Sequence, residues 1–239
     1  MNHGPEVLVF IRYPVPGRVK TRLAVHLGGE AAASLYRCFV EDTLATLSTL
    51  GWPIRLCYTP EEQVGNFLSW LGSGYVYQPQ RGSDLGERMK DAFQQAFAHG
   101  CDAACLIGSD VPDLPLAVFR EAQREMSFRD AVIGPALDGG YYLIGLHRES
   151  FSPEIFAGLA WGTSGVFSET NRLFKKKGLR VHVLPSWRDV DTLDDLRDLN
   201  RRNPGQVFSR SLTFRLLTRL DLAWPVHSSP TPSIEVKKT

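Results

Sequence analysis

Short apolar segments alternate with amphipathic ones along most of the chain. Seven segments have strand character, because they are apolar or β-branched and are bounded by Gly, Pro or Asp. Between them, apolar residues recur at three- and four-residue spacing, as along a helix that covers one face of a sheet. This alternation predicts a three-layer α/β/α fold around a mixed, mainly parallel sheet. The predicted strands are residues 7–11, 54–58, 75–78, 103–107, 131–134, 141–146 and 180–184.

The ends of the predicted helices carry their own signals. Gly51 and Gly178 end two of the apolar stripes, as glycine does after a helix C-terminus. Thr192, followed three residues later by Asp195, resembles a capping box and predicts the start of a short helix. The predicted helices begin near residues 30, 85, 116, 166 and 192.

The regular alternation stops at Asn203, where Asn-Pro-Gly breaks the pattern. We therefore expect a single catalytic domain over residues 1–203 and an appendage over residues 204–239. In the appendage, apolar spacing from about residue 208 to residue 220 predicts one more amphipathic helix, which packs onto the domain or lies on a membrane surface. Residues 228–239, rich in Pro, Ser and Lys, have the composition of a disordered tail.

Composition narrows the class of protein. The chain has 239 residues, with 27 Lys and Arg against 26 Asp and Glu, so its net charge is +1. This balance argues against nucleic-acid binding, which a clustered basic stripe would signal. The apolar run at residues 7–11 is far shorter than the roughly 18 residues of a membrane span. Four cysteines without a Cys-x-x-Cys unit fit buried thiols in a reducing compartment, so we expect a cytoplasmic protein.

The loop after the first predicted strand carries the strongest chemical signal. It holds two prolines, Gly17 and four cations, namely Arg12, Arg18, Lys20 and Arg22. The prolines stiffen the loop, and the glycine permits a close approach. Ligands of α/β sheets bind beyond the carboxyl ends of the strands, so these cations are placed to neutralise a phosphate or diphosphate. The alternative is a solvated basic loop, and the glycine spacing does not match a Walker loop.

Two aspartates are candidate ligands of a divalent cation. Asp110 follows an apolar strand, which delivers it to the same edge of the sheet as the cationic loop. Mg²⁺ is commonly held by one or two carboxylates together with substrate phosphates. Asp191, rather than Asp189, is the preferred second ligand, and a capping role is its alternative. The alternative for Asp110 is an Asx-turn or an N-cap of the helix near residue 116, a role that suits Asp113 better.

A glycine pair and two tyrosines lie between the fifth and sixth predicted strands. Gly139 and Gly140 let a ligand approach the backbone. Asp138, just before them, is either a general base for an acceptor hydroxyl or a turn-stabilising residue. Tyr141 and Tyr142 point to opposite faces of an extended strand, so only one, taken as Tyr142, lines a pocket.

Two further loops add candidate binding residues. Trp161 and Thr163 are typical of an acceptor-side loop with an aromatic platform, although Trp161 also fits a core position. Gln80 and Gly86 flank the start of the helix near residue 85, whose free N–H groups can hold a nucleotide.

Five segments in this order closely resemble a family of small bacterial GT-A-like glycosyltransferases, some associated with arsenosugar biosynthesis. The resemblance implies a nucleotide-diphospho-sugar transferase fold, a Rossmann-like N-terminal half that binds the nucleotide, and a divalent metal at Asp110. The chain is more distantly similar to nucleotidyltransferases that attach GMP or CMP to a phosphorylated cofactor precursor. The segments, within residues 6–200, are PVPGRVKTRL, GSDVPDL, GPALDGGYYLIGL, LAWGTSGVFSET and DVDT.

We therefore expect a glycosyltransferase that uses Mg²⁺ or Mn²⁺ to move a sugar from a nucleoside-diphosphate sugar to a small acceptor. Lys20 and Asp138 are the candidate catalytic residues. The alternatives are a nucleotidyltransferase, which would release pyrophosphate, and a non-catalytic nucleotide-binding or partner-binding module. The expected ligand-binding residues are Arg12, Gly17, Arg18, Lys20, Arg22, Gln80, Gly86, Tyr142, Trp161 and Thr163.

Overall fold

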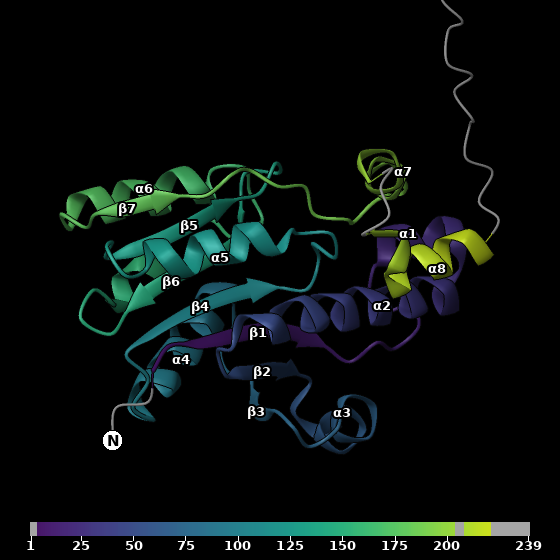
Figure 1. Ribbon diagram of the computed structural model, residues 1–239, viewed down its shortest axis with the longest axis horizontal. Coiled ribbons are helices and arrows are strands. Elements are labelled where there is room, and N and C mark those ends of the chain that lie inside the picture. The colour runs from purple at the N-terminus through teal and green to yellow at the C-terminus, as the bar shows by residue number, and fades with distance from the viewer. Residues whose placement is uncertain (1–3, 204–207, 221–239) are drawn as a thin grey trace, which may run out of the picture.

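The computed structural model describes residues 4–203 and 208–220 (Figure 1). In this part of the chain, seven strands form one sheet in the order β3-β2-β1-β4-β6-β5-β7. Strand β6 is antiparallel to both of its neighbours, and the other pairs are parallel, which confirms the expected mixed sheet. The strands are β1 (Glu6–Arg12), β2 (Ile54–Thr59), β3 (Val76–Pro79), β4 (Ala103–Gly108), β5 (Ala131–Pro135), β6 (Tyr141–His147) and β7 (Val181–Val183).

The longer helices begin where the apolar spacing predicts them. The apolar spacing predicts neither α1 nor α3, because each is short and buries a single residue, Leu23 or Phe67. The helices are α1 (Thr21–Leu27), α2 (Gly29–Leu47), α3 (Val64–Leu71), α4 (Leu85–Ala98), α5 (Leu116–Glu125), α6 (Val166–Lys176), α7 (Leu193–Arg202) and α8 (Leu212–Arg219), with 3-10 turns at Ser48–Leu50, Glu61–Gln63, Pro153–Phe156 and Phe208–Arg210.

Two apolar clusters fill the space between the sheet and its helices. Val40 of α2 and Phe119 of α5 belong to the cluster on one face. Phe93 of α4 and Phe174 of α6 belong to the cluster on the other face. The sheet is therefore the middle of three layers, as the alternation of strands and helices predicts.

A third apolar cluster joins α1, α2, α7 and α8 at one end of the molecule (Figure 1). Leu217 of α8 is buried there, so this helix packs onto the domain. The buried carboxylate of Asp42 on α2 accepts hydrogen bonds from the backbone N–H groups of Leu212 (2.8 Å) and Thr213 (2.9 Å). These N–H groups belong to the first turn of α8 and have no partner within the helix, so Asp42 satisfies them.

The described residues include no helix with the length and apolar character needed to cross a membrane. The predicted tail at residues 228–239 lies outside the described residues.

Replacing Asp42 with alanine should loosen the attachment of α8. We expect Asp42→Ala to lower the free energy of unfolding by about 2 kcal/mol, because two N–H groups lose a charged acceptor. Denaturant unfolding measures the change. Glu62→Ala, at an exposed acidic position, is the control and should stay within about 0.5 kcal/mol of the parent. Equal stability of Asp42→Ala and the control would contradict the prediction.

Candidate functional site

A cavity of about 530 Å³ lies beyond the carboxyl ends of the parallel strands. Because β6 runs against its neighbours, its first residues lie at the same edge as the last residues of β1, β4 and β5. Ligands of α/β sheets bind at this edge. Ten of the thirteen residues predicted from the sequence border the cavity: Arg12, Arg18, Lys20, Gln80, Asp110, Asp138, Tyr142, Trp161, Thr163 and Asp191.

Lys20 connects the three loops that form the charged wall of the cavity. Its Nζ atom lies 2.6 Å from Asp110 Oδ1 and 2.8 Å from Asp191 Oδ1, and it donates a hydrogen bond of 2.6 Å to the carbonyl oxygen of Val190. The Lys20 side chain is 4% exposed, whereas the two carboxylates are 47% and 43% exposed. Burial by itself would lower the pKa of Lys20, but the two carboxylates outweigh burial and raise it. The ammonium is therefore charged at neutral pH.

The backbone of Lys20 is in the left-handed region, with φ 45° and ψ 47°. Among the described residues, no other non-glycine residue has a positive φ. Such a conformation costs about 1–2 kcal/mol, and the contacts of the ammonium compensate for it. Gly17 has a φ of 75° in a turn that the bond from Arg18 N to Val15 O closes at 2.9 Å. The turn itself thus accounts for this glycine.

The segment after β7 brings Asp191 to Lys20 by crossing the ends of two strands. The backbone N–H of Trp187 donates to Pro135 O at 3.0 Å, and that of Val190 donates to Asp110 O at 2.9 Å. The two aspartates therefore lie on loops that are hydrogen-bonded to each other through the backbone.

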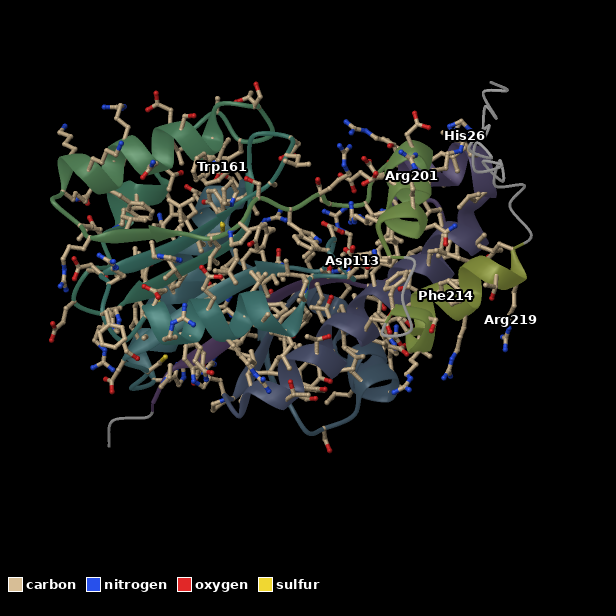
Figure 2. All side chains as sticks on the ribbon, turned by 45° about the horizontal axis from the view of Figure 1, so that its top comes forward. His26, Asp113, Trp161, Arg201, Phe214 and Arg219 are labelled. Atoms are coloured by element: carbon tan, nitrogen blue, oxygen red, sulfur yellow. The ribbon has the colours of Figure 1, made fainter. Side chains whose placement is uncertain are left out.

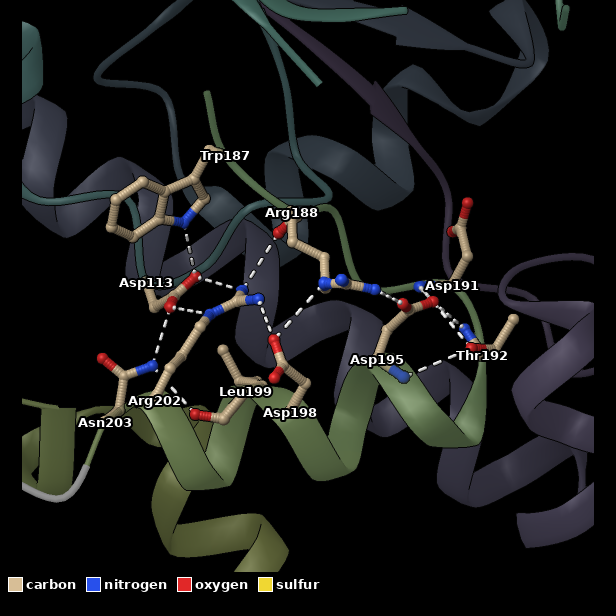
Figure 3. A network of polar contacts seen from close by, with 10 residues as sticks. All are labelled: Asp113, Trp187, Arg188, Asp191, Thr192, Asp195, Asp198, Leu199, Arg202 and Asn203. Carbon is tan, nitrogen blue, oxygen red and sulfur yellow. Dashed lines mark hydrogen bonds and ion pairs between the residues drawn. The ribbon is translucent and has the colours of Figure 1, made fainter. Parts of the chain in front are cut away.

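Asp113 holds both ends of this region, because it contacts Trp187 at the start of the segment and Arg202 at the end of α7 (Figure 3). Its carboxylate, 1% exposed, accepts hydrogen bonds from Arg202 Nε (2.7 Å), Trp187 Nε1 (3.0 Å) and Asn203 Nδ2 (2.7 Å). The expected capping role of Asp113 is wrong: α5 follows Pro115 and has no side-chain cap. The reason is that the tertiary structure brings an arginine within reach of this carboxylate.

A capping box fixes the start of α7, as the sequence predicts. Thr192 Oγ1 accepts a hydrogen bond from Asp195 N, and the Asp195 carboxylate accepts one from Thr192 N at 2.9 Å. The same carboxylate accepts a longer bond of 3.3 Å from the backbone N–H of Asp191 (Figure 3). Arg188 lies 3.3 Å from it. The box therefore holds the backbone of Asp191 as well as the helix.

Asp189 also borders the cavity, although the sequence favours Asp191 of this pair. Burial, followed by the charges of Asp138 and Asp191, raises the pKa of Asp189 to about 6. The signal in the sequence is the Asp-x-Asp spacing, which in an extended segment allows both side chains to share one side.

The pair Asp110 and Asp191 is suited to a shared cation. Both carboxylates contact the same nitrogen atom of Lys20, so the ammonium marks a place where one cation reaches both. In the part of the chain that the structure describes, no group of three or more His, Cys, Asp or Glu residues could hold a metal. A divalent ion would therefore take two carboxylates from the chain and its remaining ligands from phosphate and water, as Mg²⁺ commonly does.

Of the two glycines after Asp138, Gly139 serves the packing of the chain itself, whereas Gly140 borders the cavity. Asp138 Oδ1 accepts a hydrogen bond of 2.8 Å from Gly140 N, which is the turn-stabilising arrangement, while its exposed carboxylate borders the cavity. A Cβ atom on Gly139, whose φ is 95°, would collide with the backbone of Ser164. The expectation that a ligand approaches the backbone at Gly139 is wrong, because another loop of the chain already lies there.

Tyr141 and Tyr142 lie on opposite faces of β6 and both border the cavity. Tyr142 donates a hydrogen bond of 2.9 Å to the carbonyl oxygen of Pro185. The expectation that only one of the two lines the pocket is wrong, because the cavity extends around the end of the strand.

Trp161 borders the cavity and also packs against the second apolar cluster. Its ring meets that of Tyr141 edge to face, with centroids 6.2 Å apart. A Cβ atom on Gly86 would lie 2.5 Å from Trp161 Nε1 and 2.5 Å from the carbonyl oxygen of Phe156, so this glycine makes room for the indole and for that backbone. Figure 2 shows Trp161 in the half of the molecule opposite to Phe214 of α8.

Three of the predicted binding residues, Gly17, Arg22 and Gly86, do not border the cavity. Gly17 shapes a turn, Gly86 accommodates Trp161, and Arg22 is exposed on α1. Gln80 borders the cavity, but its amide nitrogen donates to the carbonyl oxygen of Cys57 at 2.7 Å and so ties down the end of β2. Arg88, which the sequence analysis does not single out, adds a cation to the wall.

Comparison with known proteins places the chain in a family. Residues 43–163 match the family described as "Uncharacterized protein conserved in bacteria (DUF2064)", and the chain belongs to it. A candidate nucleotide-diphospho-sugar transferase from Desulfovibrio desulfuricans G20 is 44% identical, with a TM-score of 0.88 over 92% of this chain and 96% of that one. No curated protein matches.

More distant structures share the fold alone. Rv0371c from Mycobacterium tuberculosis H37Rv, in complex with manganese, is 16% identical over 84% of this chain and 100% of that one, with a TM-score of 0.52. The 4-diphosphocytidyl-2C-methyl-D-erythritol synthase from Anaerococcus prevotii DSM 20548 is 11% identical over 83% and 98%, with a TM-score of 0.54. The expected nucleotide-diphospho-sugar transferase fold, and its distant likeness to nucleotidyltransferases, are confirmed.

Asp113→Asn tests whether the buried ion pair anchors the segment before Asp191. We expect it to lower the free energy of unfolding by about 3 kcal/mol, because Arg202 loses its buried carboxylate. Asp194→Asn is the matched control, since Asp194 also pairs with an arginine but is 87% exposed. It should change stability by less than about 1 kcal/mol. Equal effects of the two substitutions in denaturant unfolding would overturn the assignment.

Gly86→Ala tests whether this glycine positions Trp161. The added methyl group should displace the indole and cost about 2 kcal/mol of unfolding free energy. Gly65→Ala is matched to it, because each glycine is the second residue of its helix and Gly65 has open space around its Cβ position. The control should be neutral or stabilising by up to about 1 kcal/mol. A crystal structure of Gly86→Ala with Trp161 unmoved would refute the prediction.

Proposed function

We propose that this protein transfers a sugar from a nucleoside-diphosphate sugar to a small acceptor, with Mg²⁺ or Mn²⁺ as cofactor. The supporting observation is that Lys20, Asp110 and Asp191 meet in one cavity, which Trp161 and Asp138 also border. The 44% identical relative, described as a candidate nucleotide-diphospho-sugar transferase, supports the choice of a sugar donor.

The cations near the start of the chain would bind the diphosphate. Arg12 borders the cavity from the end of β1, Arg18 and Lys20 border it from the following loop, and Arg88 adds a charge from α4. Charge-assisted hydrogen bonds from arginine and lysine to phosphate oxygens are about twice as strong as neutral ones. The bound group is therefore expected to carry several negative charges.

Asp110 and Asp191 would hold the metal ion beside that diphosphate. The ion supplies a positive charge that stabilises the leaving diphosphate. The two carboxylates are near half exposed toward solvent, so an ion can reach them. Lys20 keeps its positive charge next to the same phosphates and adds to the stabilisation of the leaving group.

The acceptor would bind between Asp138 and Trp161. The carboxylate of Asp138 is exposed at the cavity wall and is the candidate base for an acceptor hydroxyl group. The Trp161 indole, held by Tyr141 and Gly86, offers a flat apolar surface for a sugar ring or an acceptor. Thr163, two residues on, also borders the cavity.

We further infer a reducing, cytoplasmic setting for the protein. Its four cysteines are free thiols, and Cys57, Cys101 and Cys105 are buried. Burial raises the pKa of the Cys57 thiol to about 12, so it is protonated and unreactive at neutral pH.

Nucleotidyl transfer is the second candidate, because the fold is shared with a structure described as a candidate glucose-1-phosphate thymidylyltransferase from Bacillus anthracis. In such an enzyme the same cations and metal would bind a nucleoside triphosphate, while a phosphate oxygen of the phosphorylated acceptor attacks its α-phosphorus and displaces pyrophosphate. The two reactions differ in the product, which is a nucleoside diphosphate in sugar transfer and pyrophosphate in nucleotidyl transfer.

The product released from a panel of substrates decides between the two candidates. The protein is incubated with Mn²⁺ or Mg²⁺ and, separately, with nucleoside-diphosphate sugars and nucleoside triphosphates together with candidate acceptors. We expect a nucleoside diphosphate, identified by chromatography and mass spectrometry. Release of pyrophosphate would overturn sugar transfer in favour of the second candidate.

Substitutions locate that activity in the cavity. Lys20→Met should lower the rate about tenfold to a hundredfold, as expected for the loss of one charge-assisted hydrogen bond. Asp110→Asn should act in the same direction through the metal site. Arg22→Gln, an exposed cation outside the cavity, is the control and should retain the parent rate. A control as slow as Lys20→Met would place the activity elsewhere.

A further inference from the structure

We propose that the Lys20 ammonium competes with the divalent metal for Asp110 and Asp191, so that the metal binds tightly only when a nucleotide diphosphate engages the lysine. This inference rests on the metal site of the proposed function and assigns its regulation. It gives Lys20 a second role besides binding phosphate.

The contacts of Lys20 show why the two cations compete. Its Nζ atom lies 2.6 Å and 2.8 Å from one oxygen of each carboxylate, at the position that a shared metal would approach. Mg²⁺ binds carboxylate oxygen at about 2.0–2.1 Å, so an ion on the same two oxygens would lie within about 5 Å of the ammonium. Two positive charges at this distance, at a partly buried site, disfavour each other.

The surroundings of Lys20 keep its charge in place. The side chain is 4% exposed, its third contact is the carbonyl oxygen of Val190, and its backbone is fixed in the left-handed conformation. Arg188 and Arg202, the neighbouring cations, are engaged with other carboxylates. Without another anion, the two aspartates are therefore the available partners of this ammonium.

A nucleotide diphosphate changes this balance from the cavity side. Its oxygens offer Lys20 a new anionic partner. They also offer the metal additional ligands, because the two carboxylates by themselves do not complete its coordination. Binding of the diphosphate then favours binding of the metal, and by linkage the metal favours the diphosphate to the same degree.

Direct measurement of Mn²⁺ binding tests the competition without any turnover. Titrations followed by the electron paramagnetic resonance signal of free Mn²⁺ give the dissociation constant of each variant, with and without a nucleoside diphosphate. Lys20→Met should bind Mn²⁺ alone at least about fivefold more tightly than the parent, and the diphosphate should add less affinity than it does in the parent. An unchanged or weaker affinity of Lys20→Met for Mn²⁺ alone would overturn the proposal.

Two further variants show whether the effect is local. Arg18→Met removes a cation that borders the same cavity but contacts neither Asp110 nor Asp191. The affinity of this variant for Mn²⁺ alone, without a nucleoside diphosphate, should differ less than twofold from that of the parent. An increase equal to that of Lys20→Met would mean a general field effect and would overturn direct competition. Adding Asp110→Asn to Lys20→Met should abolish the gained affinity. Lys20→Gln, with the same expected result, replaces the methionine variant if the latter fails to unfold cooperatively.

The outcomes separate this inference from the proposed function. Gained Mn²⁺ affinity in Lys20→Met, with no release of nucleoside diphosphate by the parent, would uphold the competition and overturn sugar transfer. Release of nucleoside diphosphate by the parent, with unchanged Mn²⁺ affinity in Lys20→Met, would support sugar transfer and overturn the competition.

Discussion

The site is organised around a single buried positive charge. The Lys20 ammonium contacts Asp110 and Asp191, which come from loops far apart in the sequence, and its own backbone adopts a conformation that non-glycine residues avoid. An ammonium removed from water requires anionic partners, and a cation between two neighbouring carboxylates reduces their mutual repulsion. The ion pairs of Lys20 therefore hold together the loop after β1, the loop after β4 and the segment after β7.

The scaffold makes this meeting possible through strand direction and two flanking networks. Parallel pairing places the ends of β1 and β4 side by side, so their loops start at the same edge. On one side of Asp191, the capping box of Thr192 and Asp195 holds the backbone. On the other side, the buried pair of Asp113 and Arg202 ties α7 to the loop that carries Asp110. Short-range capping and a long-range ion pair thus act on the same few residues.

The part of the cavity around Trp161 is held by close packing instead of by charge. Gly86 and Gly139 occupy positions where a side chain would collide with Trp161 or with the backbone of Ser164. Both glycines allow parts of the chain to approach each other, which shapes the surface without contacting a ligand. The charged wall and the part of the cavity around Trp161 therefore depend on different forces, and a change in one need not disturb the other.

The sequence by itself determined the strands, the longer helices and ten of the residues that border the cavity. Apolar periodicity marks elements that bury a continuous face, and strand-end loops with clustered charges mark the functional edge of a parallel sheet, as Lys20 and Asp110 illustrate. The short helices α1 and α3 left no such pattern, because one buried residue each defines no period. The tertiary structure decided the partners: that Asp113 pairs with Arg202 instead of capping α5, that Gly86 supports Trp161, and that Asp189 shares the cavity with Asp191. These pairings join residues distant in sequence, and local spacing carries no information about which distant side chain the folded backbone brings within a few ångströms.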